Sequence, residues 1–224
     1  MSRRPYTPFV SAKTHLVLLE DAGLRVGPTV ILQRVKLSLD AGEKVGLLGP
    51  NGSGKTTLLR LLATLQRPTS GGGTVLGADL MSNDIYRIRP HIVLIGHEPG
   101  LYPELTLAEN SRLVASLAGR DQERARTALE LVGLAGAADR RARDCSRGML
   151  RRTELARALI VEPRLLLLDE AHAGLDESAS ALVDLIAARV AERGGTAVLV
   201  SHDAERLNVD RSVRVVGGMV EQAS

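Results

Sequence analysis

Apolar and polar positions follow two different periods along the chain, and segments of the two kinds alternate. Short apolar or alternating runs, which are typical of strands, occupy residues 15–20, 31–39, 44–48, 74–76, 91–95, 165–168 and 197–200. Leucine- and alanine-rich runs with helical spacing occupy residues 55–66, 106–118, 122–132, 150–161 and 178–192. Further short strands are expected near the C-terminus. Strands that alternate with helices predict an α/β fold with a mostly parallel sheet flanked by helices.

Three segments depart from this alternation. Residues 1–13 show little periodicity, so a flexible N-terminal arm is expected there. The cluster at 68–73, one proline followed by polar residues and glycines, predicts a loop. Residues 97–154 are mainly helical and predict an inserted helical subdomain. The sequence therefore predicts one domain, 14–224, whose core is made of residues 14–96 and 155–224.

Composition limits the class of protein. The 224 residues are 44% hydrophobic and 25% charged, as in an ordinary soluble globular domain. The single cysteine, Cys145, excludes an internal disulfide and any multi-cysteine zinc site. No apolar run approaches the roughly 18 residues of a spanning helix, and none follows Arg3 and Arg4 as in a signal peptide. The chain is therefore expected in the cytoplasm, with any membrane role depending on a partner.

The positive charge is concentrated in one stretch. Net charge is only +3, and the local excess comes from six arginines: Arg140, Arg141, Arg143, Arg147, Arg151 and Arg152. A solvated face is the favoured interpretation of such a run, and contact with nucleic acid or acidic lipid is the alternative. Because no aromatic platform for bases accompanies the arginines, no nucleic-acid partner is expected.

The most specific motif is a glycine-rich loop between a predicted strand and a predicted helix. It matches the phosphate-loop pattern G-x-x-x-x-G-K-[ST] with the residues Gly49, Pro50, Asn51, Gly52, Ser53, Gly54, Lys55 and Thr56, followed by Thr57. Such loops curl backbone N–H groups around nucleotide phosphates at a helix N-terminus. Lys55 is expected to reach the β- and γ-phosphates, and the Thr56 hydroxyl to coordinate Mg²⁺.

Two carboxylates follow a fully apolar strand. The four leucines of 165–168 lead directly into Asp169 and Glu170, so both acids lie at the carboxyl end of a buried strand. Beside a phosphate loop, Asp169 is expected to hold Mg²⁺, usually through water. Glu170 is expected to orient and polarise the attacking water.

Taken together, these motifs resemble those of the ATP-binding cassette ATPases, and the resemblance extends over residues 14–221. The segment from Cys145 to Met149 resembles the signature loop of that family, with Ser146 and Gly148 matching and Arg147 between them. Asp176 corresponds to the aspartate of the D-loop. His202, after the next strand, corresponds to the switch histidine.

The resemblance implies a P-loop NTPase core with antiparallel N-terminal strands and an inserted helical subdomain. It also implies ATP and Mg²⁺ as ligands, with Lys55, Glu170 and His202 in catalysis. In the family two cassettes form a head-to-tail dimer, with each ATP between one phosphate loop and the other subunit's signature loop. An integral membrane subunit then couples ATP hydrolysis to transport, so the cassette lies on the inner face of the membrane.

Two positions depart from the family pattern. Val26 stands where the family has an aromatic residue that stacks on adenine, which predicts weaker ATP affinity and less base discrimination, unless Arg25 stacks instead. His97 stands where the family has a glutamine ligand for Mg²⁺, and imidazole suits Mg²⁺ poorly. His97 then contacts water near the metal, Glu98 replaces it as ligand, or the loop mainly contacts the membrane partner.

Within the family, the segments 96–101, 105–110 and 146–152 resemble the ATPase subunit of the cytochrome c biogenesis haem exporter. ATPases of other exporters of the ABC-2 type, for drugs, polysaccharides or lipids, are the alternative. A cassette ATPase acting on nucleic acid or ribosomes is a third possibility, disfavoured by the absence of a second cassette. A nucleotide-gated binding module without turnover is disfavoured because Lys55, Asp169, Glu170 and His202 are all present. A homodimer is a simpler assembly than a dimer with a paralogue.

Overall fold

The computed structural model describes residues 15–170, 172, 177–201 and 207–222. The predicted N-terminal arm, Asp176 and His202 lie outside these residues, so the predictions made for them stay predictions.

The larger of two sheets has six strands in the order β10-β9-β3-β8-β7-β6. Its members are β3 (Lys44–Leu48), β6 (Ile92–Ile95), β7 (Leu165–Leu168), β8 (Thr196–Val200), β9 (Arg211–Val216) and β10 (Met219–Gln222). Every pair is parallel except β9 with β10, which form a hairpin. Every residue of β7 and β8 is buried, because helices cover both faces. The predicted mostly parallel sheet is confirmed.

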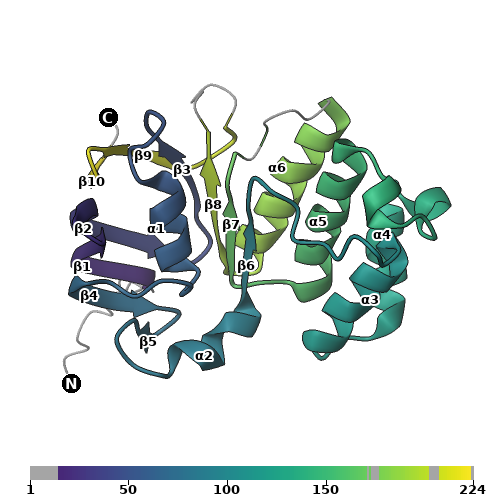
Figure 1. Ribbon diagram of the computed structural model, residues 1–224, viewed down its shortest axis with the longest axis horizontal. Coiled ribbons are helices and arrows are strands. Elements are labelled where there is room, and N and C mark those ends of the chain that lie inside the picture. Colours follow the sequence, from purple (N-terminus) through teal and green to yellow (C-terminus); the bar gives the residue numbers. More distant parts are fainter. Residues whose placement is uncertain (1–14, 171, 173–176, 202–206, 223–224) are drawn as a thin grey trace, which may run out of the picture.

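The smaller sheet is antiparallel and has the order β2-β1-β4-β5. Its members are β1 (His15–Val26), β2 (Thr29–Asp40), β4 (Ser70–Val75) and β5 (Ala78–Asp79). Helix α1 (Lys55–Leu62) lies between the two sheets (Figure 1). Its leucines pack against apolar residues of both sheets in one core cluster. The expected antiparallel N-terminal strands are therefore confirmed.

Helices α3 (Leu107–Leu117), α4 (Gln122–Leu131), α5 (Arg147–Val161) and α6 (Glu177–Glu192) lie on the other side of the large sheet from α1 (Figure 1). The short α2 (Ile85–Ile88), which precedes β6, lies instead beside β5 of the small sheet. Helices α5 and α6 cover β6, β7 and β8, whereas α3 and α4 pack with α5 around a separate apolar cluster. Helix α5 contributes to both clusters, so the predicted subdomain boundary at 154 falls inside one continuous helix. None of the described helices is long and apolar enough to cross a bilayer.

The predicted loop at 68–73 is wrong, because most of it belongs to β4. A Cβ on Gly73 would lie 2.2 Å from the Leu18 carbonyl oxygen, and one on Gly71 would lie 2.1 Å from that of Asp21. Both glycines have positive φ, 62° at Gly71 and 147° at Gly73. The glycines that predicted a loop therefore lie in strand β4. At Gly71 and Gly73 the backbone of β4 approaches β1 too closely for any side chain.

Two helix ends also differ from the prediction. Helix α1 ends at Leu62 rather than near residue 66, because Thr64 adopts a left-handed conformation with φ 58°. The Arg89 guanidinium fixes that turn by donating to both the Thr64 hydroxyl (3.1 Å) and its carbonyl oxygen (2.6 Å). Helix α5 begins at Arg147 rather than near residue 150, because Ser146 caps it.

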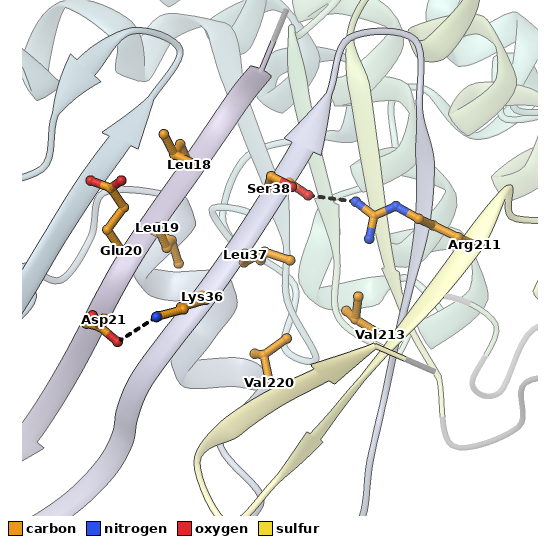
Figure 2. A pocket seen from close by; sticks show the side chains of 10 residues that line it. All are labelled: Leu18, Leu19, Glu20, Asp21, Lys36, Leu37, Ser38, Arg211, Val213 and Val220. Carbon is orange, nitrogen blue, oxygen red and sulfur yellow. Dashed lines mark hydrogen bonds and ion pairs between the residues drawn. The ribbon is translucent and has the colours of Figure 1, made fainter. Parts of the chain in front are cut away.

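A cleft of about 420 Å³ separates β1 and β2 from the β9–β10 hairpin (Figure 2). Arg211 of β9 reaches across it and donates to the carbonyl oxygen of Ser38 on β2 at 2.6 Å. Its Nε lies 2.6 Å from Glu43. Nearby, Gln33 of β2 donates two hydrogen bonds to the hairpin turn, from its N–H to the Gly218 carbonyl oxygen (2.9 Å) and from its side-chain amide to the Gly217 carbonyl oxygen (2.8 Å). The two sheets are thus joined by polar contacts at this end.

The contrast between Gly72 and Gly73 tests the close approach of β4 to β1. Gly73→Ala is expected to lower the free energy of unfolding by about 2–3 kcal/mol, because the residue has positive φ and its new methyl group would meet the Leu18 carbonyl. Gly72→Ala is the matched control, since its Cβ meets nothing within 4 Å. Urea unfolding of both variants measures the difference. Equal stability of the two would contradict the described pairing of β4.

Candidate nucleotide-hydrolysis site

The glycine-rich loop connects β3 to α1, as predicted, and its shape is fixed from two sides. Gly49 has φ 143°, and a Cβ there would lie 2.3 Å from the Val215 carbonyl oxygen of β9. Gly54 has φ 107° and caps α1 without a side-chain hydrogen bond. At the back, the Gly218 N–H donates to the Ser53 carbonyl oxygen at 3.1 Å. These contacts fix the loop at the start of α1, where the first N–H groups have no partner within the helix and can donate to an anion.

The Lys55 side chain is buried and folded over its own loop. Its Nζ donates to the carbonyl oxygens of Gly49 and Pro50, both at 2.8 Å. Burial lowers the pKa of Lys55 from its ordinary value, and the charges of Asp169 and Glu170 oppose that shift. Beside it, the buried hydroxyl of Ser53 has no hydrogen-bond partner among the described residues. A buried ammonium and an unpaired hydroxyl in a glycine-rich loop suit a polyanionic ligand.

The first carboxylate is joined directly to the loop. The Asp169 N–H donates to the Ile95 carbonyl oxygen of β6 at 2.9 Å, which continues the β6–β7 pairing past the end of β7. The Thr56 hydroxyl at the start of α1 donates to Asp169 Oδ2 at 2.8 Å. Asp169 is 6% exposed, so this bond lies in a protected environment. Two residues 113 positions apart meet as the sequence predicted.

The second carboxylate has a partner that the sequence did not predict. Glu170 Oε2 lies 3.0 Å from Nδ1 of His97 in the loop after β6. His97 therefore lies against the second acid, whereas Thr56 is the residue bonded to the first. Glu170 also has φ 50°, a left-handed conformation that is costly for a residue with a side chain.

The signature residues form the exposed start of a helix. Ser146, Arg147 and Gly148 are all exposed. The Ser146 hydroxyl accepts a hydrogen bond from the Met149 N–H at 3.3 Å, and Arg147 and Gly148 form the first turn of α5. Within the described residues, no hydrogen bond joins this segment to the chain's own phosphate loop. The helix start is therefore open to another molecule.

The position predicted to face the base is open to solvent. Val26 ends β1 and is 57% exposed. The neighbouring Arg25 guanidinium donates to the Pro28 carbonyl oxygen at 3.2 Å, so it folds over its own turn. The Arg25 N–H donates to the Thr69 hydroxyl at 3.1 Å.

The arginine-rich stretch divides into two parts, and its interpretation as one solvated face is wrong. Arg140, Arg141, Arg143 and Arg147 are exposed. Of these, Arg143 and Arg141 lie 2.6 and 3.5 Å from Glu104. Arg151 and Arg152 instead turn inward. Arg152 donates to the Val132 carbonyl oxygen at 3.2 Å and to the Ser178 hydroxyl at 2.6 Å.

One face of α5 carries three buried charges that the sequence analysis missed. Arg157 donates to the Leu94 carbonyl oxygen of β6, Arg151 donates to that of Gly96 at 2.7 Å, and Glu154 accepts from the Gly100 N–H at 2.9 Å. Burial raises the pKa of Glu154 and lowers the pKa of both arginines, while their mutual attraction opposes these shifts. Their spacing of three residues, which places them on one side of a helix, was the available signal.

Comparison with known proteins adds the decisive observation. A family model described as "ABC transporter" matches residues 32–173, a segment that contains the phosphate loop, the signature residues and both carboxylates. The chain belongs to this family.

Curated relatives of this ATP-binding cassette have several transport roles. The chain is 34% identical over 195 residues to "Cytochrome c biogenesis ATP-binding export protein CcmA 2" of Cupriavidus metallidurans, covering 86% of this chain and 91% of that protein. It is 37% identical to the daunorubicin resistance ATP-binding protein DrrA3 of Streptomyces coeruleorubidus, covering 89% of this chain and 66% of that protein. Identity to the Fe(3+) ions import ATP-binding protein FbpC of Brucella abortus is 35%, covering 93% of this chain but only 61% of that protein.

Solved structures confirm the fold. The cassette MJ0796, in a dimeric post-hydrolysis state bound to ADP and Pi, superimposes with a TM-score of 0.83 at 28% identity, covering 92% of this chain and 97% of that one. The chain therefore has the P-loop NTPase fold of a cassette and is an ATPase that binds ATP.

The Thr56–Asp169 hydrogen bond can be tested through stability in the absence of nucleotide. Thr56→Val is expected to lower the free energy of unfolding by about 1–3 kcal/mol, because the buried Asp169 carboxylate loses a donor. Thr56→Ser keeps the donor, and Thr57→Val leaves the bond intact, so both are expected within about 0.5 kcal/mol of the parent chain. Thermal and urea unfolding measure the differences. A Thr56→Val variant as stable as Thr56→Ser would rule the bond out.

Proposed function

We propose that this ATPase is the energising subunit of an exporter, held on the inner face of the membrane by a separate integral membrane subunit. The observation that carries the catalytic part is the meeting of the phosphate loop with Asp169 and Glu170. In this proposal the loop N–H groups and Lys55 bind the ATP phosphates, with Gly49, Pro50, Asn51, Gly52, Ser53, Gly54, Thr56 and Thr57 forming the cradle. Val26 contacts the base.

The residues present fit a magnesium ion. Thr56 and Asp169 offer a hydroxyl and a carboxylate 2.8 Å apart, and hard oxygen ligands are those that Mg²⁺ prefers. Mg²⁺ usually takes one or two protein oxygens and completes its shell with water and substrate phosphates. When bound, the ion neutralises charge on the phosphates during transfer. His97 is not part of this proposed set, because its ring lies against Glu170.

Glu170 is the proposed general base. It follows Asp169 at the carboxyl end of β7, the edge of the sheet where the phosphate loop also begins. In this proposal the carboxylate accepts a proton from the attacking water, and His97, whose Nδ1 lies 3.0 Å from Oε2, holds that carboxylate in place. Lys55 stabilises the negative charge on the transferred phosphoryl group. His202 and Asp176 are proposed to complete the site from outside the described residues.

A second subunit supplies the other half of the proposed site. The start of α5 presents exposed N–H groups at Ser146, Arg147 and Gly148, where the helix dipole favours an anion. MJ0796 has been solved as a dimer. We infer a head-to-tail dimer of this chain, or of this chain with a paralogue. Each ATP then lies between one phosphate loop and the partner's signature residues.

An apolar groove supports the proposed membrane partner. It has a volume of about 490 Å³ and lies between α3 and the segment around β6. Three exposed apolar side chains line it: Leu65 (59%), Tyr102 (61%) and Leu117 (78%). No acidic residue is among the described lining residues, and Arg89 supplies positive charge; Arg157 also borders the groove, but its side chain donates to the Leu94 carbonyl oxygen and is attracted by Glu154 of its own helix. The proposed occupant is therefore a short amphipathic segment of the membrane subunit with an apolar face and an acidic side chain.

Export of haem is the more specific form of this proposal. Its support is the similarity to CcmA, which extends over 91% of that protein's length, together with the segments 96–101, 105–110 and 146–152. Export of drugs, polysaccharides or lipids is the alternative, supported by the similarity to DrrA3. The importers, by contrast, are matched over a smaller share of their length.

The assignment of Glu170 predicts a separation of binding from turnover. Glu170→Gln is expected to lower kcat by about 10²–10⁴-fold, because an amide cannot accept the proton, while ATP binding and ATP-held dimers persist. Lys55→Ala is the contrasting variant, expected to lose ATP binding as well. Single-turnover hydrolysis and gel filtration with ATP measure the two properties. Undiminished turnover by Glu170→Gln would remove this residue from catalysis.

The membrane-partner proposal is tested by capture from detergent-solubilised native membranes, with mass spectrometry of stoichiometric partners. A polytopic membrane protein is expected, and its identity distinguishes haem export from other substrates. Leu117→Glu in the groove should abolish its recovery, whereas Leu131→Glu, equally apolar and 57% exposed on α4 outside the groove, should retain it. Recovery of ribosomal or DNA-bound partners alone would overturn the transporter proposal and leave the ATPase assignment intact.

A further inference from the structure

Arg151, at the start of α5, forms hydrogen bonds with two other segments beside the proposed hydrolysis site. Its side chain is 13% exposed. One guanidinium nitrogen donates to the Gly96 carbonyl oxygen at 2.7 Å. The other donates to the carbonyl oxygens of Asp169 at 3.1 Å and Glu170 at 3.3 Å. The start of α5, the loop after β6 and the acidic end of β7 therefore share one side chain.

The backbone of Glu170, to which Arg151 donates, has an unfavourable conformation. Glu170 has φ 50°, which costs a residue with a side chain more than an ordinary conformation. The two accepting carbonyl groups belong to the peptide groups before and after the Cα of Glu170. Donation to both carbonyls fixes these two peptide groups relative to each other, and the direction of the Glu170 side chain follows from that.

We propose that Arg151 is a positioning residue for ATP hydrolysis, which holds the backbone of Glu170 in its left-handed conformation and thereby aims the carboxylate. The inference rests on the proposed role of Glu170 as the general base. Arg151 touches neither substrate nor metal in this proposal, and it acts through the Glu170 backbone alone. A misdirected carboxylate still allows nucleotide to bind, but it leaves the attacking water without an aligned acceptor.

A planar guanidinium is required for this task. Its fork presents parallel donors to Gly96 on one side and to the Asp169–Glu170 peptide on the other, which a single ammonium group cannot reach together. Glu154, one turn along α5, provides a compensating negative charge, with Oε2 lying 4.0 Å from Arg151 Nη1. Because backbone acceptors and a counter-charge are both in place, the buried cation is stable where it lies.

Arg157 provides a matched control. It lies on the same face of α5, is largely buried beside the same Glu154, and donates to the Leu94 carbonyl oxygen of β6, two residues before the Gly96 carbonyl that Arg151 contacts. No hydrogen bond recorded in the described residues joins it to Asp169 or Glu170. Losing either arginine disturbs packing, but only the loss of Arg151 releases the backbone of the proposed base.

The experiment compares Arg151→Lys and Arg157→Lys in the full chain. Arg151→Lys is expected to lower kcat about 10–100-fold, with the Kd for a non-hydrolysable ATP analogue changed by less than about twofold. Arg157→Lys is expected to lower the unfolding midpoint while kcat per nucleotide-binding site stays within about threefold. Arg151→Gln, which keeps an amide donor, serves if the lysine variant does not fold. Equal kcat in the two lysine variants would overturn the proposal.

A double variant distinguishes this inference from the assignment of Glu170. If Arg151 acts through Glu170, adding Arg151→Lys to Glu170→Gln should cause no further loss of the residual turnover. A multiplicative loss would show that Arg151 acts by another route. Full turnover by Glu170→Gln alone would instead refute the base itself. Loss of turnover by Glu170→Gln together with an unaffected Arg151→Lys would refute only the positioning role.

Discussion

Parallel pairing of β3, β8 and β7 is the constraint on which the site depends. Parallel strands end at the same edge of a sheet, so the loop that leaves β3 and the acids that leave β7 must meet there. The hydrogen bond from Thr56 to Asp169 spans that edge and fixes the start of α1 against the end of β7. Without this edge, the glycine-rich loop would bind an anion but would have no carboxylate beside it.

The buried charges of α5 are the second layer of support. Arginine and glutamate in an apolar helix face carry a large desolvation cost, and removing one member of such a set costs about 3–5 kcal/mol. Here each charge is matched by a backbone group of the segment from Leu94 to Gly100, in addition to its charged neighbours. That segment also lines the apolar groove. Of the three charges, Arg157 borders the proposed partner surface and Arg151 donates to the backbone of Asp169 and Glu170, so one helix face connects the two regions.

The features that the sequence predicted correctly are those that depend on residues close together along the chain. The phosphate loop is a continuous motif with a strand before it and a helix after it, and the leucines of β7 require burial whatever surrounds them. Gly71 and Gly73 were misread because a glycine is equally at home in a turn and in a strand that approaches another backbone closely. Only the distant partner, β1, decides between the two. The partners of Arg151 and His97 could not be predicted for the same reason: these partners, Glu170 among them, lie far away in the sequence.

The phosphate loop is supported by the hairpin turn at Gly217 and Gly218, which is synthesised long after the loop itself. The loop is synthesised early, yet its Ser53 carbonyl accepts from Gly218, and β3 is flanked by β8 and β9 from the last part of the chain. On the ribosome, the nascent nucleotide site therefore stays unformed until the residues of the hairpin have left the exit tunnel. A nascent chain that still lacks the hairpin also lacks this support for its phosphate loop, so ATP is expected to bind only after residues 211–222 have been synthesised.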